Sequence, residues 1–241
     1  GSFYQANSVD QLVAAFKSIV SNAMTTSTLF AAPGVSINRF NNLFHDDQVY
    51  YSLFKPDRNQ MWKGNVKKFR ICQGTESPPC QSGELMDAKG KPAVDVNKYI
   101  ATGAQSFWGT APDGGAVTLG GAGAQVPPPG ERQVYTYLGD ASSGLNHHIP
   151  VITANNKIDV QNTDLQAAIF GTDSPDDFEK VINWINGQDV NDENGTGDTT
   201  SPRWTFADPL HSTPGIVVYG GEEGQQRTKL VVGTNDGLVR M

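Results

Sequence analysis

Hydrophobic residues recur at helical spacing in two segments of the chain, residues 9–23 and residues 176–186. The first segment begins after Ser8, and Gln11 follows three positions later, which is the spacing of a capping box at the start of a helix. Ser174 is placed to cap the second segment. The apolar stripe of the first helix must pack against a sheet or another helix. We therefore expect residues 9–23 to lie at the edge of a domain.

Alternation of polar and apolar residues predicts strands in most of the other patterned segments. These segments are residues 35–38, 48–54, 61–71, 133–138, 215–220, 229–233 and 238–241, with shorter ones at 104–108 and 116–119. Within residues 61–71, Gly64 and Asn65 predict a bulge or tight turn. The same alternation places Lys67 on one face with Phe69.

The sequence Asn235-Asp236-Gly237 predicts a hairpin turn between the last two strands. Strands outnumber helices, and the 26 Gly and 14 Pro residues favour frequent turns over long helices. The expected fold class is α+β, mostly β, with antiparallel strands. Residues 72–150 are dominated by Gly, Pro, Ala and Asp, so we expect long Gly/Pro-rich insertions or an interaction surface there.

Composition and charge exclude several classes of protein. Apolar residues make up 37% of the chain and charged residues 18%, which is unlike a disordered sequence. The net charge of -7 provides no positive field for a phosphate backbone, so we expect no nucleic-acid partner. No apolar run reaches the roughly 18 to 20 residues that a membrane-spanning helix needs.

Cys72 and Cys80 stand at the two ends of a short polar loop. Zinc needs more ligands than this pair offers, and the spacing differs from the Cys-x-x-Cys of thioredoxin-like sites. A disulfide would stabilise the loop by about 2.5 kcal/mol and would imply export. Two reduced thiols in a cytosolic protein are the alternative interpretation.

Oxygen-bearing side chains between residues 189 and 198 form a candidate calcium site, because Ca²⁺ prefers carboxylate and amide oxygens. The candidate ligands are Asp189, Asn191, Asp192, Glu193, Asn194 and Asp198. An EF-hand is excluded, because a loop that starts at Asp192 has Arg203 where the bidentate Glu belongs. A calcium loop of another kind and a solvated acidic turn remain the two interpretations.

Asp208, His211 and Ser212 are the residue types of a hydrolase triad, but they lie too close in sequence to converge as one. We expect Asp208 and His211 to hydrogen-bond the backbone instead. Residues 120–124 are Gly-rich but lead into Pro residues rather than a helix, so they predict no phosphate-binding loop. The adjacent pair His147-His148 is expected at the surface. We therefore expect no catalytic residues and a protein that is not an enzyme.

Eight strings of residues point together to one family. They are residues 48–56, 62–69, 106–108, 113–117, 120–122, 132–137, 207–214 and 232–238. In this order they resemble the PilC/PilY family of type IV pilus biogenesis factors and tip adhesins, with residues 207–214 and 232–238 the most specific pieces. Arg240 stands where members of that family often have His after the Asn-Asp-Gly turn.

The resemblance implies a domain order. Residues 1–34 would be the terminal helix of a von Willebrand factor A-like domain with a linker, and residues 35–241 would lead into a truncated β-propeller. The antiparallel strands would then be partial propeller blades, and the sequence would belong to a longer protein.

The resemblance also implies a function and a location. The protein would be exported through the periplasm to the outer membrane, the cell surface or the pilus tip. It would support pilus biogenesis, twitching motility and attachment to host-cell or abiotic surfaces under calcium control, with pilins and minor pilins as partners.

Two other functions fit parts of the pattern. Trp62-Lys63-Gly64-Asn65 and the Gly-Thr-Asn-Asp-Gly turn at residues 233–237 also suit propellers of quinoprotein oxidoreductases, which need a complete ring of blades. A purely structural linker is the third possibility.

Overall fold

The computed structural model describes residues 8–25, 33–35, 47–57, 61–75, 79–137, 156–165, 170–219 and 227–241. The chain divides into two compact units. Unit 1 consists of residues 1–125 and 206–241, and unit 2 consists of residues 126–205. The described strands are antiparallel and form two small sheets with few helices beside them, which confirms the α+β, mostly β fold class. The boundary at residue 34 and the assignment to propeller blades stay predictions.

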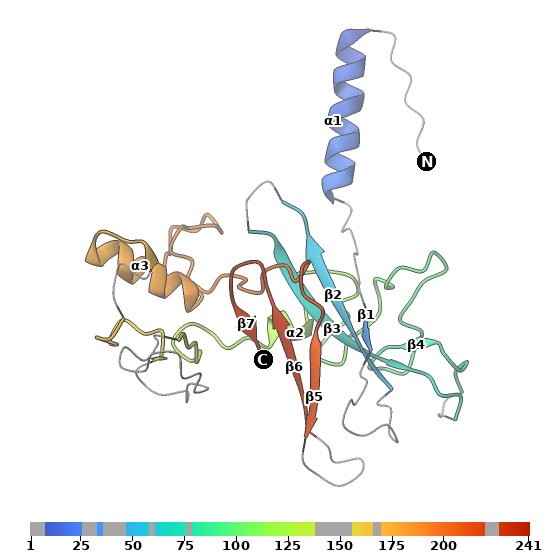
Figure 1. The fold of residues 1–241 in the computed structure, drawn as a ribbon. Coiled ribbons are helices and arrows are strands. Elements are labelled where there is room, and N and C mark those ends of the chain that lie inside the picture. Colours follow the sequence, from blue (N-terminus) through green and yellow to red (C-terminus); the bar gives the residue numbers. More distant parts are fainter. Residues whose placement is uncertain are drawn as a thin grey trace. The chain divides into compact units, whose positions relative to one another are not determined.

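The first sheet of unit 1 has the strand order β1-β2-β3-β4 (Figure 1). Its strands are β1 (Pro33–Val35), β2 (Gln48–Lys55), β3 (Lys63–Ile71) and β4 (Leu85–Met86). The predictions for residues 48–54 and 61–71 are confirmed. Of the strand predicted at residues 35–38, Val35 belongs to β1, and residues 36–38 lie outside the described residues.

The predicted bulge at Gly64 and Asn65 is wrong, because both residues belong to an uninterrupted ladder. Gly64 pairs with Phe54, and Asn65 pairs with Leu53. The glycine is needed for a different reason. A Cβ at Gly64 would stand 2.6 Å from the Cα of Asp208 and closer still to the preceding carbonyl oxygen, so the chain leading to β5 packs directly on β3.

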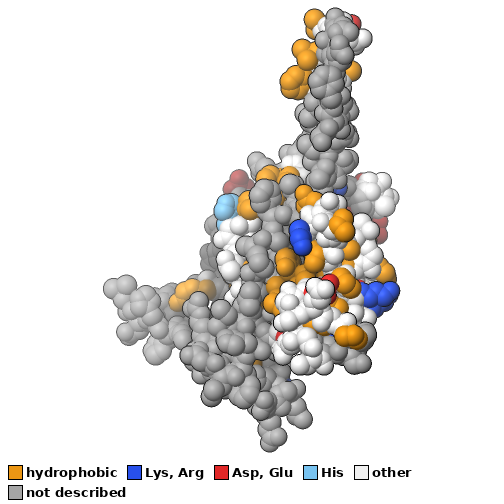
Figure 2. Space-filling model, turned by 90° about the vertical axis from the view of Figure 1, so that its right-hand side faces the viewer, with side chains coloured by type: hydrophobic (Ala, Val, Ile, Leu, Met, Phe, Trp, Pro, Cys, Tyr) orange, Lys and Arg blue, Asp and Glu red, His pale blue; other side chains and the backbone are white. Residues whose placement is uncertain are grey.

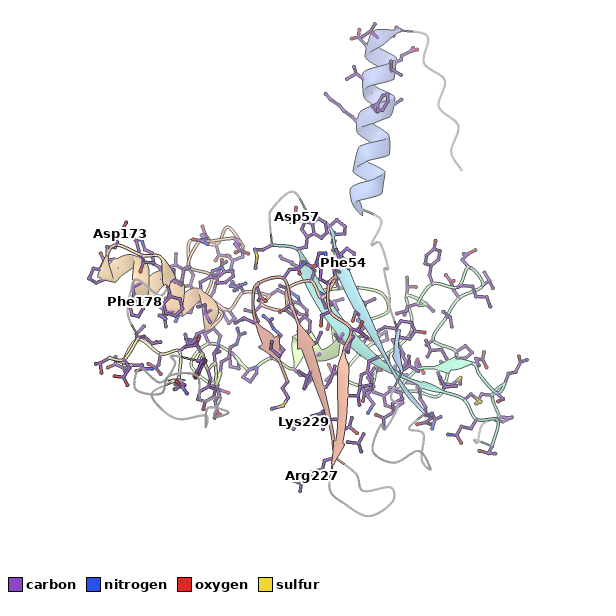
Figure 3. All side chains as sticks on the ribbon, viewed as in Figure 1. Phe54, Asp57, Asp173, Phe178, Arg227 and Lys229 are labelled. Carbon is purple, nitrogen blue, oxygen red and sulfur yellow. A yellow bond between two sulfur atoms is a disulfide. The ribbon has the colours of Figure 1, made fainter. Side chains whose placement is uncertain are left out.

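Aromatic side chains close the loop end of the β2–β3 hairpin. Phe54 stacks on Trp62 with ring centroids 5.9 Å apart, and the Trp62 indole N–H donates to the carbonyl oxygen of Asp57 at 2.9 Å. Phe54 and Asp57 lie close together at this end of the sheet in Figure 3. Trp62 thus stabilises the hairpin through packing and one hydrogen bond.

Irregular segments contribute nearly as many buried apolar side chains to the core of unit 1 as the strands do. β2 and β3 contribute apolar residues that include Leu53 and Phe69. The other side of the core comes from β4 and the turns after it, through Leu85, Ala93, Ile100, Ala104 and Val117. Regular structure is sparse after Cys72, as predicted, but this segment is part of the packed core rather than only a displayed insertion.

The short strands predicted at residues 104–108 and 116–119 are wrong, since both segments form turns. Backbone hydrogen bonds of turn length close them, for example from Gly109 to Ser106 at 3.0 Å and from Ala116 to Asp113 at 3.0 Å. The Gly-rich run after them contains the one-turn helix α2 (Gly121–Ala124), where the sequence predicted no helix. At this length, α2 offers no helix terminus for an anion.

The second sheet of unit 1 has the strand order β5-β6-β7. Its strands are β5 (Gly215–Tyr219), β6 (Arg227–Gly233) and β7 (Val239–Arg240). Arg227 and Lys229 mark the start of β6 in Figure 3. The turn predicted at Asn235-Asp236-Gly237 is confirmed, with Gly237 at φ 79° and the N–H of Thr234 bonded to the carbonyl oxygen of Leu238 at 2.9 Å.

The helix predicted near the start of the chain is α1 (Val9–Thr25). The N–H of Gln11 donates to the Ser8 hydroxyl at 3.3 Å, as in the predicted cap. The described part of the apolar stripe of α1 is exposed and forms the hydrophobic patch along this helix in Figure 2. The exposed residues are Val9, Leu12, Val13 and Phe16. None of the helices in the described ranges has the length and apolarity to cross a membrane.

Unit 2 is organised around α3 (Pro175–Ile185). The Ser174 hydroxyl caps this helix by accepting from the N–H of Asp177 at 3.1 Å, as predicted. Ile182 is fully buried against Ile158 and Leu165. The strand predicted at residues 133–138 is reduced to one bridge between Tyr135 and Lys157, with residue 138 outside the described residues.

Candidate functional site

Two segments of unit 1 that are distant in sequence meet beside the second sheet. The N–H of Asn235, in the β6–β7 turn, donates to the backbone carbonyl oxygen of Asp208 at 2.9 Å. The side-chain amide of Asn235 donates to Asp208 Oδ1 at 2.6 Å. We call the polar residues at this meeting point the junction cluster; they are Asp208, His211, Asn235, Asp236 and Arg240.

Asp208 is the buried member of the cluster, with 2% of its surface exposed. Its Oδ1 also accepts from the N–H of Leu210 at 3.3 Å, which matches the expected bond to the backbone. Burial raises the pKa of Asp208, against the opposing effects of that N–H and of the nearby His211. The carboxyl therefore accepts a proton more readily than an exposed aspartate does.

Asp236 and Arg240 form the second part of the junction cluster. Arg240 Nη2 lies 2.5 Å from Asp236 Oδ2, and the Thr234 hydroxyl donates to Asp236 Oδ1 at 2.5 Å. Burial raises the pKa of Asp236, but the hydrogen bond and charge of Arg240 outweigh it and hold the pKa below its usual value. The guanidinium also lies over the ring of Phe206 at 5.2 Å. Arg240 thus stabilises the preceding turn at residues 235–237 through its bonds to Asp236.

The geometry does not join Asp208, His211 and Ser212 into a relay. His211 Nδ1 lies 3.3 Å from Asn235 Oδ1, so its partner is a side-chain amide rather than the expected backbone group. The Ser212 hydroxyl accepts from the N–H of Gly233 at 3.0 Å. Each of the three side chains therefore ties the segment before β5 to the neighbouring turn or strand.

The predicted calcium ligands share one loop of unit 2, and the side-chain oxygens of four of them, Asp189, Asp192, Asn194 and Asp198, accept hydrogen bonds from the loop itself. Asp189 is 1% exposed, and its two oxygens accept the N–H groups of Glu193 at 2.8 Å and Asn194 at 3.0 Å. Asp192 accepts the N–H of Gly197 at 2.9 Å, and Asp198 accepts that of Thr200 at 3.0 Å. The hydroxyl and N–H of Thr200 lower the pKa of Asp198.

This loop is a folded turn built on Asp189. Asn194 Oδ1 accepts from both the N–H and the hydroxyl of Thr196, while Asn191 and the side chain of Glu193 lie at its surface. Within the ranges that the structure describes, no three His, Cys, Asp or Glu side chains gather into a group able to hold a metal ion. Calcium binding stays a prediction.

Cys72 and Cys80 form the predicted disulfide, with an S–S distance of 2.02 Å. Cys72 is buried and anchors the loop to the chain before β4. Its N–H donates to the carbonyl oxygen of Glu84, and its own carbonyl oxygen accepts from Gly83, both at 2.8 Å. The pair His147-His148 lies outside the described residues.

Two buried polar side chains of β3 hold the irregular segment of unit 1. Asn65 donates to the carbonyl oxygens of Val117 at 2.8 Å and Gly120 at 3.0 Å. Lys67 pairs with Asp113 at 3.1 Å. Lys67 was not predicted as a buried residue, although the alternation that placed it on one face with Phe69 was a signal for it. No signal in the sequence named Asp113 as its partner.

The same segment presents apolar side chains to solvent. Val96, Tyr99, Phe107 and Leu119 are between 41% and 94% exposed. Their neighbours in the chain, such as Ile100 and Ala104, are buried in the core. Because buried and exposed side chains follow one another along this segment, its packing on the core holds the exposed side chains at fixed positions without strands.

Comparisons with models of protein families, with curated proteins and with solved structures gave no match.

Proposed function

We propose that this chain is a segment of an exported type IV pilus assembly and adhesion factor of the PilC/PilY kind, which acts by binding rather than by catalysis. The observation that carries the proposal is the junction cluster. Residues 207–214 and 232–238, the strings with the most specific resemblance, contact each other through Asp208 and Asn235. If the chain shares the architecture of that family, we expect the two strings that resemble it most to contact each other in the fold.

The disulfide supports the exported location. Disulfides persist in the periplasm and at cell surfaces and are rare in reducing cytosol. The Cys72–Cys80 bond closes a loop at the margin of the core of unit 1. We place the protein in the periplasm during export and then at the outer membrane, the cell surface or the pilus tip.

Binding would use the irregular segment of unit 1. Tyr99 and Phe107 are 60% and 41% exposed, and aromatic side chains are frequent anchors at protein interfaces. The N–H of Tyr99 donates to Asp95 Oδ1 and that of Phe107 to the carbonyl oxygen of Lys68, both at 3.0 Å, and these bonds fix the turns that carry them. Pilins, minor pilins and a host-cell or abiotic surface are the proposed partners.

Deletion of the encoding gene in its own bacterium tests this function. We expect loss of surface pili and of twitching motility, and recovery of both with the wild-type gene. Recovery of pili but reduced attachment is expected with a Tyr99→Ser/Phe107→Ser variant. The matched control is Val239→Ser, which changes an exposed apolar side chain of β7. Normal piliation and twitching in the deletion strain would contradict the proposal.

Removal of residues 72–150 is not a usable test of the segment. It would take Leu85, Ile100 and Val117 out of the core of unit 1, so loss of function would report unfolding. Substitutions at exposed side chains keep the core intact. With them, a purely structural linker would retain full attachment, whereas an adhesive surface would not.

A further inference from the structure

A lysine and an aspartate from distant parts of unit 1 face each other inside the protein. Lys67 Nζ lies 3.1 Å from Asp113 Oδ2, and the two side chains are 0% and 3% exposed. Lys67 belongs to β3, and Asp113 belongs to the turns before α2. This distance joins the amine to an oxygen of the carboxyl group, so it holds Nζ beside the group that carries Cγ.

Two backbone carbonyl groups orient the amine. Lys67 Nζ donates to the carbonyl oxygens of Asp113 and Gly114, both at 2.7 Å. These two acceptors take two of the three N–H bonds, so the third points at the Asp113 carboxyl. When that proton moves to the carboxylate, the nitrogen lone pair faces the carboxyl group, while the other two N–H bonds keep their acceptors.

Burial disfavours the charged form of Lys67. Burial lowers the pKa of Lys67, although the charge of Asp113 opposes this. Transfer of one proton from the ammonium to the carboxylate replaces two buried charges by a neutral amine and a carboxylic acid. A neutral lysine is a nucleophile, and burial of this kind activates lysines in enzymes.

The carboxyl group of Asp113 is held by a second buried residue, Ser106. The N–H of Ser106 donates to Asp113 Oδ1, and its hydroxyl donates to Asp113 Oδ2, both at 2.7 Å. The N–H is placed to stabilise negative charge on Oδ1 when Cγ is attacked. The pair is shielded from solvent, with side chains 0% and 3% exposed, and Gly120 packs so closely on the carboxyl group that an added Cβ would overlap it.

We propose that Lys67 and Asp113 condense to form an intramolecular isopeptide bond, which ties β3 covalently to the turns before α2. The lone pair of the neutral Nζ attacks Cγ of the protonated Asp113 carboxyl, and Oδ1 takes the negative charge. The Cγ–Oδ2 bond then breaks, and Oδ2 leaves as water with a proton from the nitrogen. The net change is an ammonium and a carboxylate that become one amide and one water molecule, with no oxidant or other reactant.

Mass spectrometry of the intact purified chain, with its disulfide reduced, tests the bond. We expect the protein to be lighter than its sequence by one water molecule. A tryptic digest should lack cleavage after Lys67 and should contain a branched peptide that joins Lys67 to Asp113. Lys157 and Asp159 are an internal control. Their ion pair is as short, at 2.9 Å, but its side chains are 40% and 33% exposed, so their peptide should retain its full mass.

Asp113 precedes Gly114, and a succinimide at this bond would also lose one water molecule. The Lys67→Arg variant separates the two reactions, since it keeps the charge but should restore the full mass only if Lys67 is the nucleophile. The wild-type mass and digest decide the matter even if this variant does not fold. Full sequence mass in the wild type would overturn the proposal, as would a loss of water confined to an Asp-Gly succinimide.

Discussion

Gly64 lies against the backbone of Ala207, so that β3 of the first sheet touches the chain that leads into the second. Lys63 and Ala207 form an antiparallel bridge, and the N–H of Gly64 donates to the carbonyl oxygen of Phe206 at 2.8 Å. The absence of a side chain at Gly64 makes this approach possible. This backbone contact positions Asp208 and the junction cluster.

Gly64→Ala should destabilise unit 1. The added methyl group would meet backbone atoms that cannot rotate away, and overpacking of this kind costs about 1 to 3 kcal/mol. Gly215→Ala is the matched strand control, because its nearest new contact is an ordinary 3.7 Å from the Val231 carbonyl oxygen. Denaturant unfolding measures both variants, and equal stabilities would argue against the close packing of β3 on Ala207.

Asp113→Ala should be among the most damaging substitutions in unit 1. It removes the partner of the fully buried Lys67 and, with it, the proposed covalent bond. The loss of a buried pair alone costs about 3 to 5 kcal/mol. The surface pair Lys180 and Asp177 provides the contrast, with side chains 67% and 60% exposed. Lys180→Ala should change the free energy of unfolding by less than about 1 kcal/mol. A small effect of Asp113→Ala would mean that Lys67 does not depend on this partner.

Loss of the disulfide should lower the stability of unit 1. For a loop as short as residues 72–80, the chain-entropy model gives about 2.5 kcal/mol. We expect the Cys72→Ser/Cys80→Ser variant to unfold at lower denaturant concentration than the wild type. A reducing agent should bring the wild type close to the variant and leave the variant unchanged. If reduction shifts both proteins equally, the disulfide is not the cause.

The raised pKa of Asp208 predicts a pH dependence of stability. Between 3.8 and its raised pKa, the folded state binds more protons at Asp208 than the unfolded state, so this group makes the protein less stable as pH rises. Asp208→Asn keeps an acceptor for Asn235 and Leu210 and removes the buried charge. The variant should equal or exceed the wild type in stability at neutral pH and lose that advantage near pH 4. A large destabilisation at neutral pH would contradict this account.

Asp236 should behave in the opposite way, because its pKa is lowered. Its contribution is present above pH 3.8 and is lost as pH falls through the lowered value. Asp236→Asn should cost about 1 to 3 kcal/mol at neutral pH, since it weakens the charged bonds to Arg240. The cost should fall in strong acid. A penalty that does not vary with pH would show that the charge of Asp236 is unimportant.

The acidic loop of unit 2 contains an aspartate with a structural role, Asp189, beside other residues that are candidate calcium ligands. Asp189→Asn should destabilise the loop without any calcium, because only one of its two acceptors would remain for Glu193 and Asn194. Glu193→Gln changes an exposed side chain and is the cleaner probe of calcium. Calorimetry should detect heat with millimolar calcium that weakens in Glu193→Gln. No heat in the wild type would remove the calcium prediction.

The long patterned elements could be predicted from the sequence, and the contacts between distant residues could not. β2, β3, α3 and the last hairpin follow local alternation, capping and turn signals, and the cysteine spacing indicated the disulfide. Gly64 was predicted to form a bulge because the residue whose backbone requires a glycine there, Ala207, lies far along the chain. In the candidate site, the local bonds of Asp208 were expected, but its partner Asn235 comes from another turn.

The direct test of an exported binding protein is the location and redox state of the native protein in its own bacterium. Cells are fractionated while free thiols are blocked by rapid alkylation, and the peptides that contain Cys72 and Cys80 are measured by mass spectrometry. We expect the protein outside the cytoplasm, with both cysteines unalkylated and joined to each other. A cytoplasmic protein in which both cysteines are alkylated would contradict the account.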